Sequence, residues 1–534
     1  MEGTHSSIDG DEEMTTMTRS PARAPRLRRL AQATTASAAV AILAVISGCS
    51  RQSVDLGTAD SDDVIVASIS GEPDQLDPHS TTSYFAFEVL ENVYDTLVEP
   101  DEEFNMQPAL AESWEVSDDE LTWTFHLRED VTFHDGSDFT ADDVVYSYRR
   151  IIDGELANAW KLTMLTDVRA VDDHTVEIDV DAPSPTLLSA LGGFKGVAIV
   201  EEDNAESGDI TTHPIGTGPF AVDSARPGDS VTLKANEDYW GGAPEVAGVQ
   251  FRYITEHNTA VAALRSGEID WTDSIPPQQF GTLDKDQSLH IESVISNDYW
   301  YVAMNEAKEP FDNPQVRQAI AYAVDRDSIA QATGFGTSEV NQTAIPESSP
   351  WAYDYAPFER DTDKAQQLLD EAGVSDLSME LMVTNEYPET VTAAQVMADN
   401  LSDVGISVSI TTLDFGSWLD RQGQGDFDAL MLGWLGNIDP DDYYYAQHHS
   451  EGPSNSQGYS NPEVDKLLEA ARVEMDEGKR HELYEQAAKH IVDDVSYLYL
   501  YNPAVIQAHT SRLEGYTIRS DRAVRFRDAQ LTED

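Results

Sequence analysis

The sequence predicts an α/β protein in which strand patterns and helix patterns alternate along most of the chain. The 534 residues are 40% apolar and include 16 Phe, 21 Tyr and 9 Trp, which suffices for a folded core and is unlike a disordered chain. Segments of alternating apolar and polar residues indicate strands, and segments with helix caps and helical spacing stand between them. This mixture favours an α/β fold over a β-sandwich or a helical bundle. At roughly 150 residues per domain, the length favours at least two compact units.

The N-terminal segment has the order basic, apolar, small. Five arginines precede the apolar run Ala36–Ile46, which is followed by Ser-Gly-Cys. The run is shorter than the ~18 to 20 residues that cross a bilayer as a helix, so we expect a cleaved signal peptide over residues 1–48. Ile46–Cys49 resembles the bacterial lipobox, which implies lipidation of Cys49. An ordinary signal peptide with a chance cysteine is the alternative, and the export route stays open.

Residues 49–63 are small and polar and have no hydrophobic periodicity, so we expect a flexible tether there. The rest of the chain contains no internal repeat and no second apolar run long enough to span a membrane. We therefore expect one continuous folded unit from residue 64 onward.

The clearest strand pattern is Leu121–Arg128, where apolar and polar residues alternate without interruption. A helix start follows it, because Thr140 and Asp143 have the spacing of a capping box and apolar residues then recur at helical spacing. A strand followed by a capped helix agrees with the α/β class.

Three further helices have clear boundaries. Asn313–Pro314 and Asn461–Pro462 each place a capping residue before a proline in the first turn. Asp361–Ala372 has a helical pattern that ends at Gly373, a typical C-terminal cap.

Two strands are predicted near the C-terminus. Phe427–Trp434 is an apolar run that ends in an aromatic residue and indicates a buried strand. Val495–Tyr501 alternates with period two and leads into a tail that has no core of its own. We expect this second strand to return the chain to the part of the fold made by its N-terminal half.

The charge of the chain limits its partners. With 33 basic and 98 acidic residues the formal net charge is −65, which excludes direct nucleic-acid binding because phosphates need clustered Lys and Arg. The single cysteine excludes an intramolecular disulfide and a cysteine-based zinc or iron–sulfur site. We interpret the acidic surface as an adaptation to saline surroundings.

A series of segments then identifies a family. In chain order they are Ala109–Trp114, Leu121–Arg128, Val131–Gly136, Thr140–Val144, Pro214–Phe220, Asn236–Trp240, Ala263–Asp270 and Val316–Ile320. Together they resemble the signature of extracellular solute-binding proteins of family 5, which are the peptide, dipeptide and nickel receptors of ABC importers. The resemblance covers nearly all of the chain after the leader.

The resemblance implies a two-lobed clamshell of the periplasmic-binding-protein type (class II, peptide-binding), with a hinge between the lobes. We expect lobe I over residues 64–296 with a C-terminal return at 500–534, and lobe II over 297–499. Ligands of such proteins bind between the lobes and stabilise the closed form. The partners implied are membrane permease subunits with their ATPases. A lipid on Cys49 would hold the receptor, which we expect to be a monomer, at the outer face of the membrane.

The expected floor of the cleft begins at Gly433, Trp434 and Leu435, because in the family this segment lies along the peptide and offers backbone donors and acceptors. A carboxylate near it normally receives the ligand's ammonium. An ungapped alignment puts Asn437 at that place, and Asn cannot neutralise a cation. Asp439 is the alternative, although Asp–Pro at this place is also a turn element of the family.

Five other residues complete the candidate ligand-binding set: Phe415, Trp300, Tyr301, Asn305 and Glu72. Phe415 is expected half in the core and half in the cleft wall. Trp300 and Tyr301 precede Asn305 at the expected crossing into lobe II, where one of the alternating aromatic residues should face the cleft. Glu72 matches a lobe I loop near the ligand in the family, and is otherwise a solvated surface residue.

The absence of two basic residues indicates the class of ligand. Gln422 and Met431 stand where some members carry basic residues for the ligand carboxylate. We therefore expect a peptide, and an oligopeptide held by its backbone rather than a free dipeptide. A blocked peptide, an oligosaccharide or another neutral solute remains open.

The competing class is an enzyme. The sequence contains no Gly-x-Ser-x-Gly elbow, Walker loop, His-Glu-x-x-His helix or EF-hand loop, so we expect neither catalysis nor a cofactor. A secreted hydrolase with two catalytic carboxylates needs no motif and stays a remote alternative, as does a surface sensor of the same fold. We expect no metal, because the adjacent His448 and His449 are poorly placed to share one ion.

If the acidic surface is an adaptation to saline surroundings, salt should stabilise the protein. The free energy of unfolding should rise between low and molar salt, because ions screen the repulsion among the carboxylates. Denaturant unfolding at both salt concentrations measures this difference, and equal stability would contradict the hypothesis.

Overall fold

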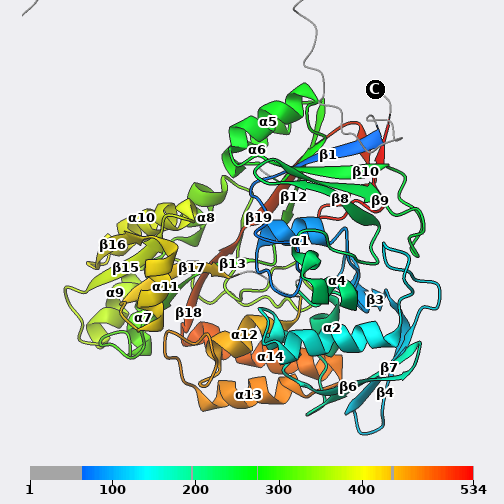
Figure 1. Cartoon of the computed structure of the whole chain (residues 1–534). Coiled ribbons are helices and arrows are strands. Elements are labelled where there is room, and N and C mark those ends of the chain that lie inside the picture. Colours follow the sequence, from blue (N-terminus) through cyan, green and yellow to red (C-terminus); the bar gives the residue numbers. More distant parts are fainter. Residues whose placement is uncertain (1–62, 194–195, 274, 435–437, 533–534) are drawn as a thin grey trace, which may run out of the picture. The chain divides into compact units, whose positions relative to one another are not determined.

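The computed structural model describes residues 63–193, 196–273, 275–434 and 438–532, which all belong to the unit formed by residues 51–534. The expected signal peptide, Cys49, Leu435 and Asn437 lie outside the described residues. Three larger β-sheets organise the unit, with helices packed on their faces (Figure 1).

The first sheet has the strand order β12-β19-β11-β1-β10-β9-β8. Its strands are β1 (Val64–Ile69), β8 (Phe220–Arg226), β9 (Ser230–Ala235), β10 (Gly248–Tyr253), β11 (Trp271–Thr272), β12 (Leu289–Ile295) and β19 (Ala504–Thr510). The central strand β1 is buried along its whole length and pairs in parallel with β10 and β11. Helices α5 (His257–Ser266) and α6 (Pro277–Leu283) contact this sheet, and α1 (Tyr84–Leu90) and α4 (Glu202–Ser207) pack against its hydrophobic core. Residues from both ends of the chain thus build one sheet.

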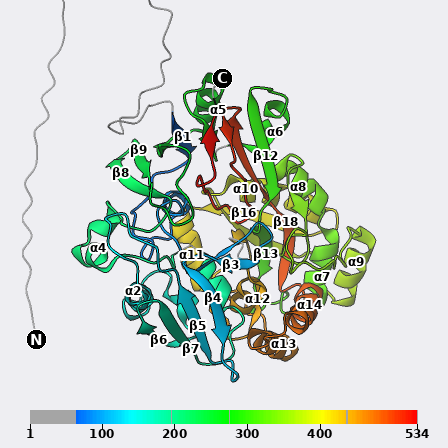
Figure 2. The same ribbon diagram turned by 90° about the vertical axis from the view of Figure 1, so that its right-hand side faces the viewer.

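The second sheet is antiparallel, with the order β4-β5-β7-β6. Its strands are β4 (Ala111–Val116), β5 (Thr122–Leu127), β6 (Leu165–Asp172) and β7 (Thr175–Val180). Helix α2 (Ala141–Asp153) packs on β6 and β7 (Figure 2). The neighbouring elements are the hairpin β2 (Val98–Pro100) and β3 (Met106–Pro108), the short helix η2 (Ala159–Leu162) and α3 (Leu187–Gly192). The short helix η3 (Asp209–Thr211) contacts α4.

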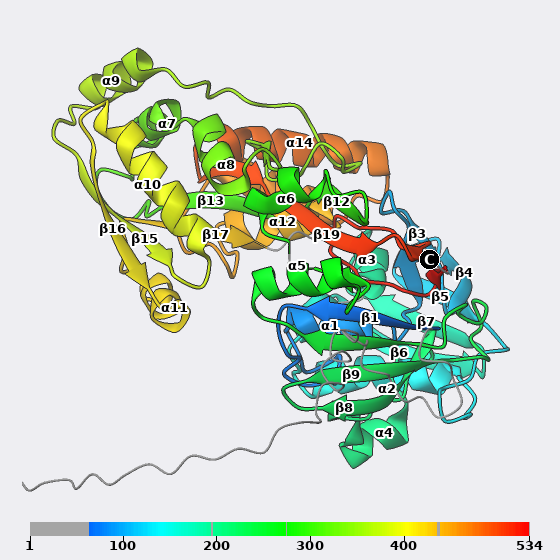
Figure 3. The same cartoon turned by 90° about the horizontal axis from the view of Figure 1, so that it is seen from above.

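The third sheet has the order β14-β18-β13-β17-β15-β16. Its strands are β13 (Tyr299–Met304), β14 (Glu339–Val340), β15 (Ser378–Thr384), β16 (Ser407–Leu413), β17 (Ala429–Trp434) and β18 (Tyr497–Asn502). The helices are α7 (Pro314–Ala323), α8 (Arg326–Gly334), α9 (Thr362–Glu371), α10 (Pro388–Ser402), α11 (Phe415–Gly423), α12 (Pro440–His448), α13 (Pro462–Arg472) and α14 (Glu477–Asp493). Figure 3 shows α10 lying along β15 and β16, which its contacts also place together. None of the helices among the described residues is long and apolar enough to cross a membrane.

The local predictions for helices and strands are confirmed. Strand β5 alternates between buried and half-buried residues as expected. The carboxylate of Asp143 accepts hydrogen bonds from the Thr140 backbone N–H at 2.8 Å and from its hydroxyl at 3.1 Å, which closes the start of α2. Helices α7 and α13 begin after their predicted caps. Helix α9 lies within the predicted range Asp361–Ala372, and Gly373 follows it with a positive φ of 70°.

Strand β18 forms as predicted, but the alternation of its sequence does not give it a wet face. Every residue from Tyr497 to Asn502 is buried. Helix α8 contacts the strand, and so does α14. The period-two pattern therefore separates tyrosines from leucines within a buried strand.

The chain crosses between the first and third sheets twice, and the two crossings are neighbours. Strand β12 leads into β13 through residues 296–298, and β18 leads into β19 through Pro503. The Ser296 N–H donates to the Pro503 carbonyl at 2.8 Å and so joins the crossings. The buried Asn502 amide donates to the carbonyls of Asp298 and Ala344 at 2.8 and 2.7 Å.

Ion pairs hold the C-terminal return to the end of α1 and to the strand Val98–Pro100. Arg525 and Arg527 both contact Glu99 (3.1 and 2.8 Å), and Arg525 also contacts Glu91. Within the return, burial opposes ionisation of Asp521, but the charge and hydrogen bonds of Arg519 outweigh it and lower the pKa to about 2. The last strands, β20 (Leu513–Glu514) and β21 (Gln530–Leu531), pair with each other.

Replacing Asn502 tests the importance of the crossings. Asn502→Ala leaves two buried carbonyls without their donors, so we expect it to lower the free energy of unfolding by roughly 2 to 4 kcal/mol. Denaturant unfolding measures the loss, and the exposed amide Gln278, changed to Ala, is the matched control. A loss no larger than that of the control would show that the crossing does not depend on this amide.

Candidate ligand-binding site

The predicted residues Trp300 and Gly433 lie opposite each other on the paired strands β13 and β17. Directly opposed residues of an antiparallel pair share one face of the sheet. A Cβ atom on Gly433 would lie 3.2 Å from atoms of the Trp300 ring. The glycine therefore lets the indole lie against the backbone of β17.

Trp300 belongs to a run of aromatic side chains on this face. Its ring meets Tyr387 edge-on at 5.9 Å between centroids, and Tyr387 meets Phe415 edge-on at the same distance. Phe415 then stacks on the buried Trp418 at 6.1 Å. Tyr387, which precedes α10, is 41% exposed and joins two residues that were predicted separately. We call Trp300, Tyr387 and Phe415 the aromatic face.

The neighbours of Trp300 point to the opposite face of the sheet. Tyr299 and Tyr301 are each 1% exposed, and Tyr301 stacks on Tyr497 with 4.0 Å between ring centroids. Tyr301 is thus a core residue, and Trp300 alone of the predicted pair reaches the accessible face. Trp434 lies opposite Tyr299 at the end of β17 and is half-buried.

Asn305 and Asp439 have protein partners for their polar groups. The Asn305 amide donates to the Gly425 and Phe427 carbonyls at 3.1 Å, and its oxygen accepts from the Ala307 N–H. Asn305 therefore holds the loop before β17.

The two oxygens of Asp439 meet Arg480 at 2.5 and 2.8 Å, and one of them also accepts from the Asp441 N–H at the start of α12. Both Asp439 and Arg480 are buried. The charge of Asp439 is therefore already compensated within the protein.

Glu72 lies in the loop after β1, more than two hundred residues before Trp300 in the sequence. It is exposed and accepts a hydrogen bond from the Gly228 N–H at 2.9 Å. The prediction that it contacts a ligand stays a prediction, as do those for Leu435 and Asn437.

Contacts also join the elements around the first sheet to those around the third. Arg522 of the C-terminal return forms an ion pair with Asp298 at 2.8 Å, and the Tyr84 hydroxyl of α1 donates to the Arg522 carbonyl at 2.7 Å. Arg522 has a positive φ of 63°, a conformation that a side chain rarely adopts. This strained residue thus lies beside the first crossing.

Comparison with known proteins decides the family. A model of the bacterial extracellular solute-binding proteins of family 5 (middle region) matches residues 105–456. The chain is 30% identical over 486 residues to the glutathione-binding protein GsiB of Salmonella typhi, covering 88% of this chain and 94% of that protein.

The chain belongs to family 5 of these proteins.

Solved structures agree with this assignment. The periplasmic binding protein DppA of Helicobacter pylori, in complex with the peptide STSA, matches with a TM-score of 0.75 and 27% identity. The oligopeptide-binding protein AppA of Bacillus subtilis, in complex with a nonapeptide, matches with a TM-score of 0.72 and 27% identity. Both alignments cover 88% of this chain and 98% or 99% of the other. The fold is thus the two-lobed α/β clamshell that the resemblance to family 5 implied.

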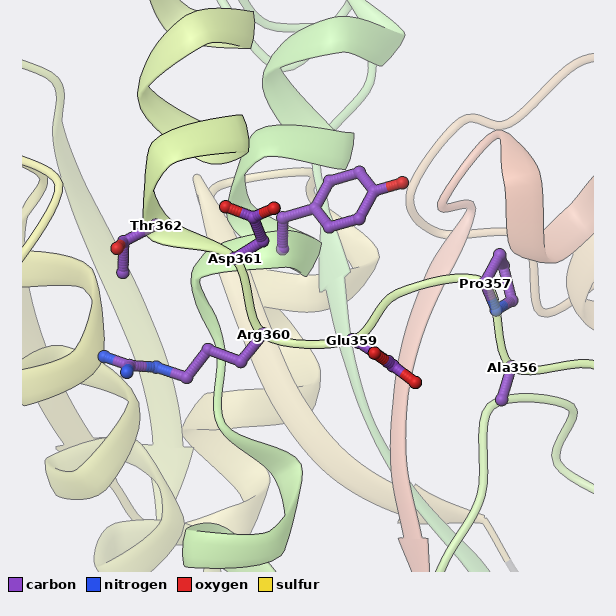
Figure 4. A pocket seen from close by; sticks show the side chains of 7 residues that line it. Ala356, Pro357, Glu359, Arg360, Asp361 and Thr362 are labelled. Carbon is purple, nitrogen blue, oxygen red and sulfur yellow. The ribbon is translucent and has the colours of Figure 1, made fainter.

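This family 5 receptor also has an open surface hollow of about 570 Å³ away from the predicted site. Tyr322, Ala356, Pro357, Glu359, Arg360, Asp361 and Thr362 line it (Figure 4). Arg360 forms an ion pair with Asp403, and Asp361 caps α9. None of the predicted site residues lines this hollow.

The two adjacent histidines have separate partners in the receptor. His448 is buried between the hydroxyls of Ser496 and Tyr499, and burial lowers its pKa to about 3. His449 stacks on Tyr445 and approaches Glu469. Among the described residues, no group of three or more potential ligands is placed to hold a metal ion.

The role of Asp439 can be tested without a ligand. Asp439→Asn leaves Arg480 as a buried cation with a weakened partner, so we expect the free energy of unfolding to fall by about 3 kcal/mol. Asp327→Asn, which changes an exposed residue in the first turn of α8, should have little effect. If both variants are as stable as the wild type, Asp439 does not have the structural role assigned to it here.

Proposed function

We propose that the protein is the extracellular receptor of an ABC importer, which binds a peptide between its two lobes and delivers it to the membrane permease. The observation that carries this proposal is the match, over nearly their whole length, to two structures that contain peptides. The alternative, a secreted hydrolase, has no support from the relatives, whose names describe binding proteins.

The proposed lobes follow the two chain crossings. Lobe I comprises the first and second sheets, over residues 64–296 and the C-terminal return, and lobe II comprises the third sheet and its helices from residue 297. The sequence places the return after residue 499. Because β18 pairs within the third sheet up to Asn502, we place the second crossing at Pro503. Two short adjacent crossings are suited to a hinge.

The aromatic face and Trp434 are the proposed contact surface of lobe II. Trp300, Phe415 and Trp434 are half-buried and Tyr387 is exposed, so they present apolar area that a peptide's side chains can cover. The adjacent end of β17 supplies backbone groups of the kind that hold an extended peptide. Such a surface recognises shape and backbone more than charge.

An oligopeptide fits this surface better than a free dipeptide. Gln422, which stands where a basic residue was sought, donates to the Ser456 hydroxyl at 3.1 Å, and Met431 is buried. Asp439 is paired with Arg480. The places expected to hold both charged ends of a dipeptide therefore provide no free charge, and a longer backbone has to supply the affinity.

The N-terminal segment completes the proposal. A lipid on Cys49 and the tether 49–63 would hold the monomeric receptor at the outer face of the cell membrane, beside the permease and its ATPases. The basic, apolar and small-residue order of the leader supports this localisation.

A thermal-shift screen tests the function. The unit from Ser50 to Asp534, in high salt, is heated with peptides of two to eight residues or with cello- and xylo-oligosaccharides. Longer peptides should raise the melting temperature, because a ligand that binds only the folded state stabilises it. A shift with sugars alone would keep the receptor class and overturn the peptide assignment.

Replacing Trp434 tests whether the proposed contact surface binds the peptide. Trp434→Ala should weaken the binding of a peptide found in the screen by about tenfold or more, since aromatic anchors dominate such contacts. Val473→Ala, which changes another exposed apolar residue (44%), is the control. Equal affinities for the two variants would remove Trp434 from the site.

A further inference from the structure

Arg522 lies at the junction of the two proposed lobes. Its side chain forms the ion pair with Asp298 at the first crossing, and the centre of its guanidinium group lies 5.8 Å from the ring centroid of Tyr84 in α1. Its charge also acts on Glu389 in the first turn of α10, where it opposes the rise in pKa that burial causes. Groups from both proposed lobes thus surround this one cation.

The backbone of Arg522 is fixed on both sides, whereas its side chain is only partly bonded. The Arg522 carbonyl accepts the hydrogen bond of the Tyr84 hydroxyl, and the Arg522 N–H donates to the Arg519 carbonyl at 3.1 Å. In the guanidinium group, Nη2 binds Asp298, but among the described residues the buried Nε has no hydrogen-bond partner. The side chain can therefore change its partner without a movement of the main chain.

Glu88 is a buried carboxyl group beside this cation. It is 1% exposed, and neither of its side-chain oxygens has a hydrogen-bond partner in the part of the chain that the structure describes. Glu88 follows Tyr84 by four residues on α1, and residues at this spacing are neighbours on one face of a helix. Because Arg522 lies over the ring of Tyr84, Glu88 is the next side chain along that face. A buried carboxyl group without a partner destabilises the protein unless it holds a proton or a cation reaches it.

The titratable groups around Glu88 come from α1, from the segment after β11 and from the C-terminal return: Tyr84, Glu91, Asp273, Tyr516 and Arg522. Burial raises the pKa of Glu88 well above its ordinary value, and the carboxylates among these neighbours add to the rise. The charge of Arg522 opposes it. Glu88 therefore holds a proton while Arg522 is bonded to Asp298, and direct contact with the guanidinium group would favour its ionised form.

We propose that Arg522 exchanges its partner between Asp298 and Glu88 when the lobes move about the hinge. The inference rests on the lobes and the hinge of the proposed function. Asp298 directly precedes the first strand of lobe II, whereas Glu88 and the return that carries Arg522 belong to lobe I. A movement of lobe II that draws Asp298 away leaves the guanidinium group beside Glu88. Glu88 then gives its proton to solvent and accepts the guanidinium group in an ion pair.

The exchange keeps the cation paired in both positions of the hinge. Breaking an ion pair in a buried place without a replacement is strongly destabilising, and this loss alone would oppose movement of the lobes. With Glu88 as a second acceptor, the two positions differ less in free energy, so the differential affinity of a ligand can shift the population between them. The alternative is that Glu88 is only a protonated core residue, in which case Glu88 and Asp298 act independently.

A double-mutant cycle in the ligand-free protein distinguishes these two cases. The variants are Glu88→Gln, Asp298→Asn and the double variant, each unfolded by denaturant at neutral pH. Glu88→Gln should raise the unfolding equilibrium constant by roughly tenfold or more beyond its effect in the wild type when Asp298→Asn is present, because Glu88 then holds Arg522. Equal effects of Glu88→Gln in the two backgrounds overturn the exchange.

The matched control is another glutamate with a largely buried side chain. Glu306 is 11% exposed at its side chain and is paired with Arg317 inside lobe II. Glu306→Gln should have the same effect in the wild type and in Asp298→Asn. An effect of Glu306→Gln that depends on the background as strongly as that of Glu88→Gln also overturns the exchange.

The position of the hinge is measured with spin labels on the two lobes. The labels are attached at Val171→Cys in β6 and Asp370→Cys in α9, which are both exposed positions. They are specific, because residues 50–534 contain no cysteine of their own. The distance distribution between the labels then reports the separation of the lobes.

This distribution should change from neutral to alkaline pH in the protein with no other substitution, because an ionised Glu88 attracts Arg522 away from Asp298. Glu88→Gln should abolish the change, which needs no variant of Asp298. A change with pH that survives in Glu88→Gln, or a distribution that does not respond to pH at all, overturns the inference. These measurements use no ligand, so such a result leaves the receptor function intact, and the thermal-shift screen decides that function separately.

Discussion

The structure depends on two neighbouring chain crossings that belong to both halves of the fold. Strands β12 and β13 follow each other across one crossing, and β18 and β19 follow each other across the other. Because β12 pairs with β19 and β13 with β18, the same two segments form a ladder in each sheet. The bond between Ser296 and Pro503 and the amide of Asn502 keep these segments in register. The chain passes between the two sheets through these few residues, which is where we propose the hinge.

The same constraint decides which side chains are accessible. Strand β13 is paired on both sides, and its side chains alternate between the two faces of the sheet. Tyr299 and Tyr301 therefore lie in the core, and Trp300 lies on the other face. The tyrosines pack against residues of α12 and β18, including Tyr443 and Tyr497. One strand thus supplies both the core that supports α12 and the indole that the ligand is proposed to meet. A shift of the strand by one residue would exchange the core tyrosines with the tryptophan proposed to contact the ligand.

Local features of the sequence predicted most of the secondary structure and the fold class. Caps such as Thr140 with Asp143 act within four residues, so they can be recognised without the fold. The site was less accessible to such reasoning. The partner of Asp439 is Arg480, 41 residues away, and Tyr387 joins Trp300 to Phe415 from a loop that carries no motif. The sequence did not predict which distant residues pair, because such pairing depends on tertiary structure.

The path of the chain also has a consequence for its biogenesis. Strand β19 stands between β12 and β11 in the first sheet, although it is among the last segments to be synthesised. Until it arrives, β12 has no neighbour in that sheet and β11 is bonded on one side only. The arginines that hold Glu91 and Glu99 come later still. The first sheet therefore cannot be completed until the C-terminal strands emerge, whereas the strands and helices of the third sheet are complete once β18 has emerged. Synthesis from the N-terminus thus finishes the inserted sheet before the sheet that begins the protein.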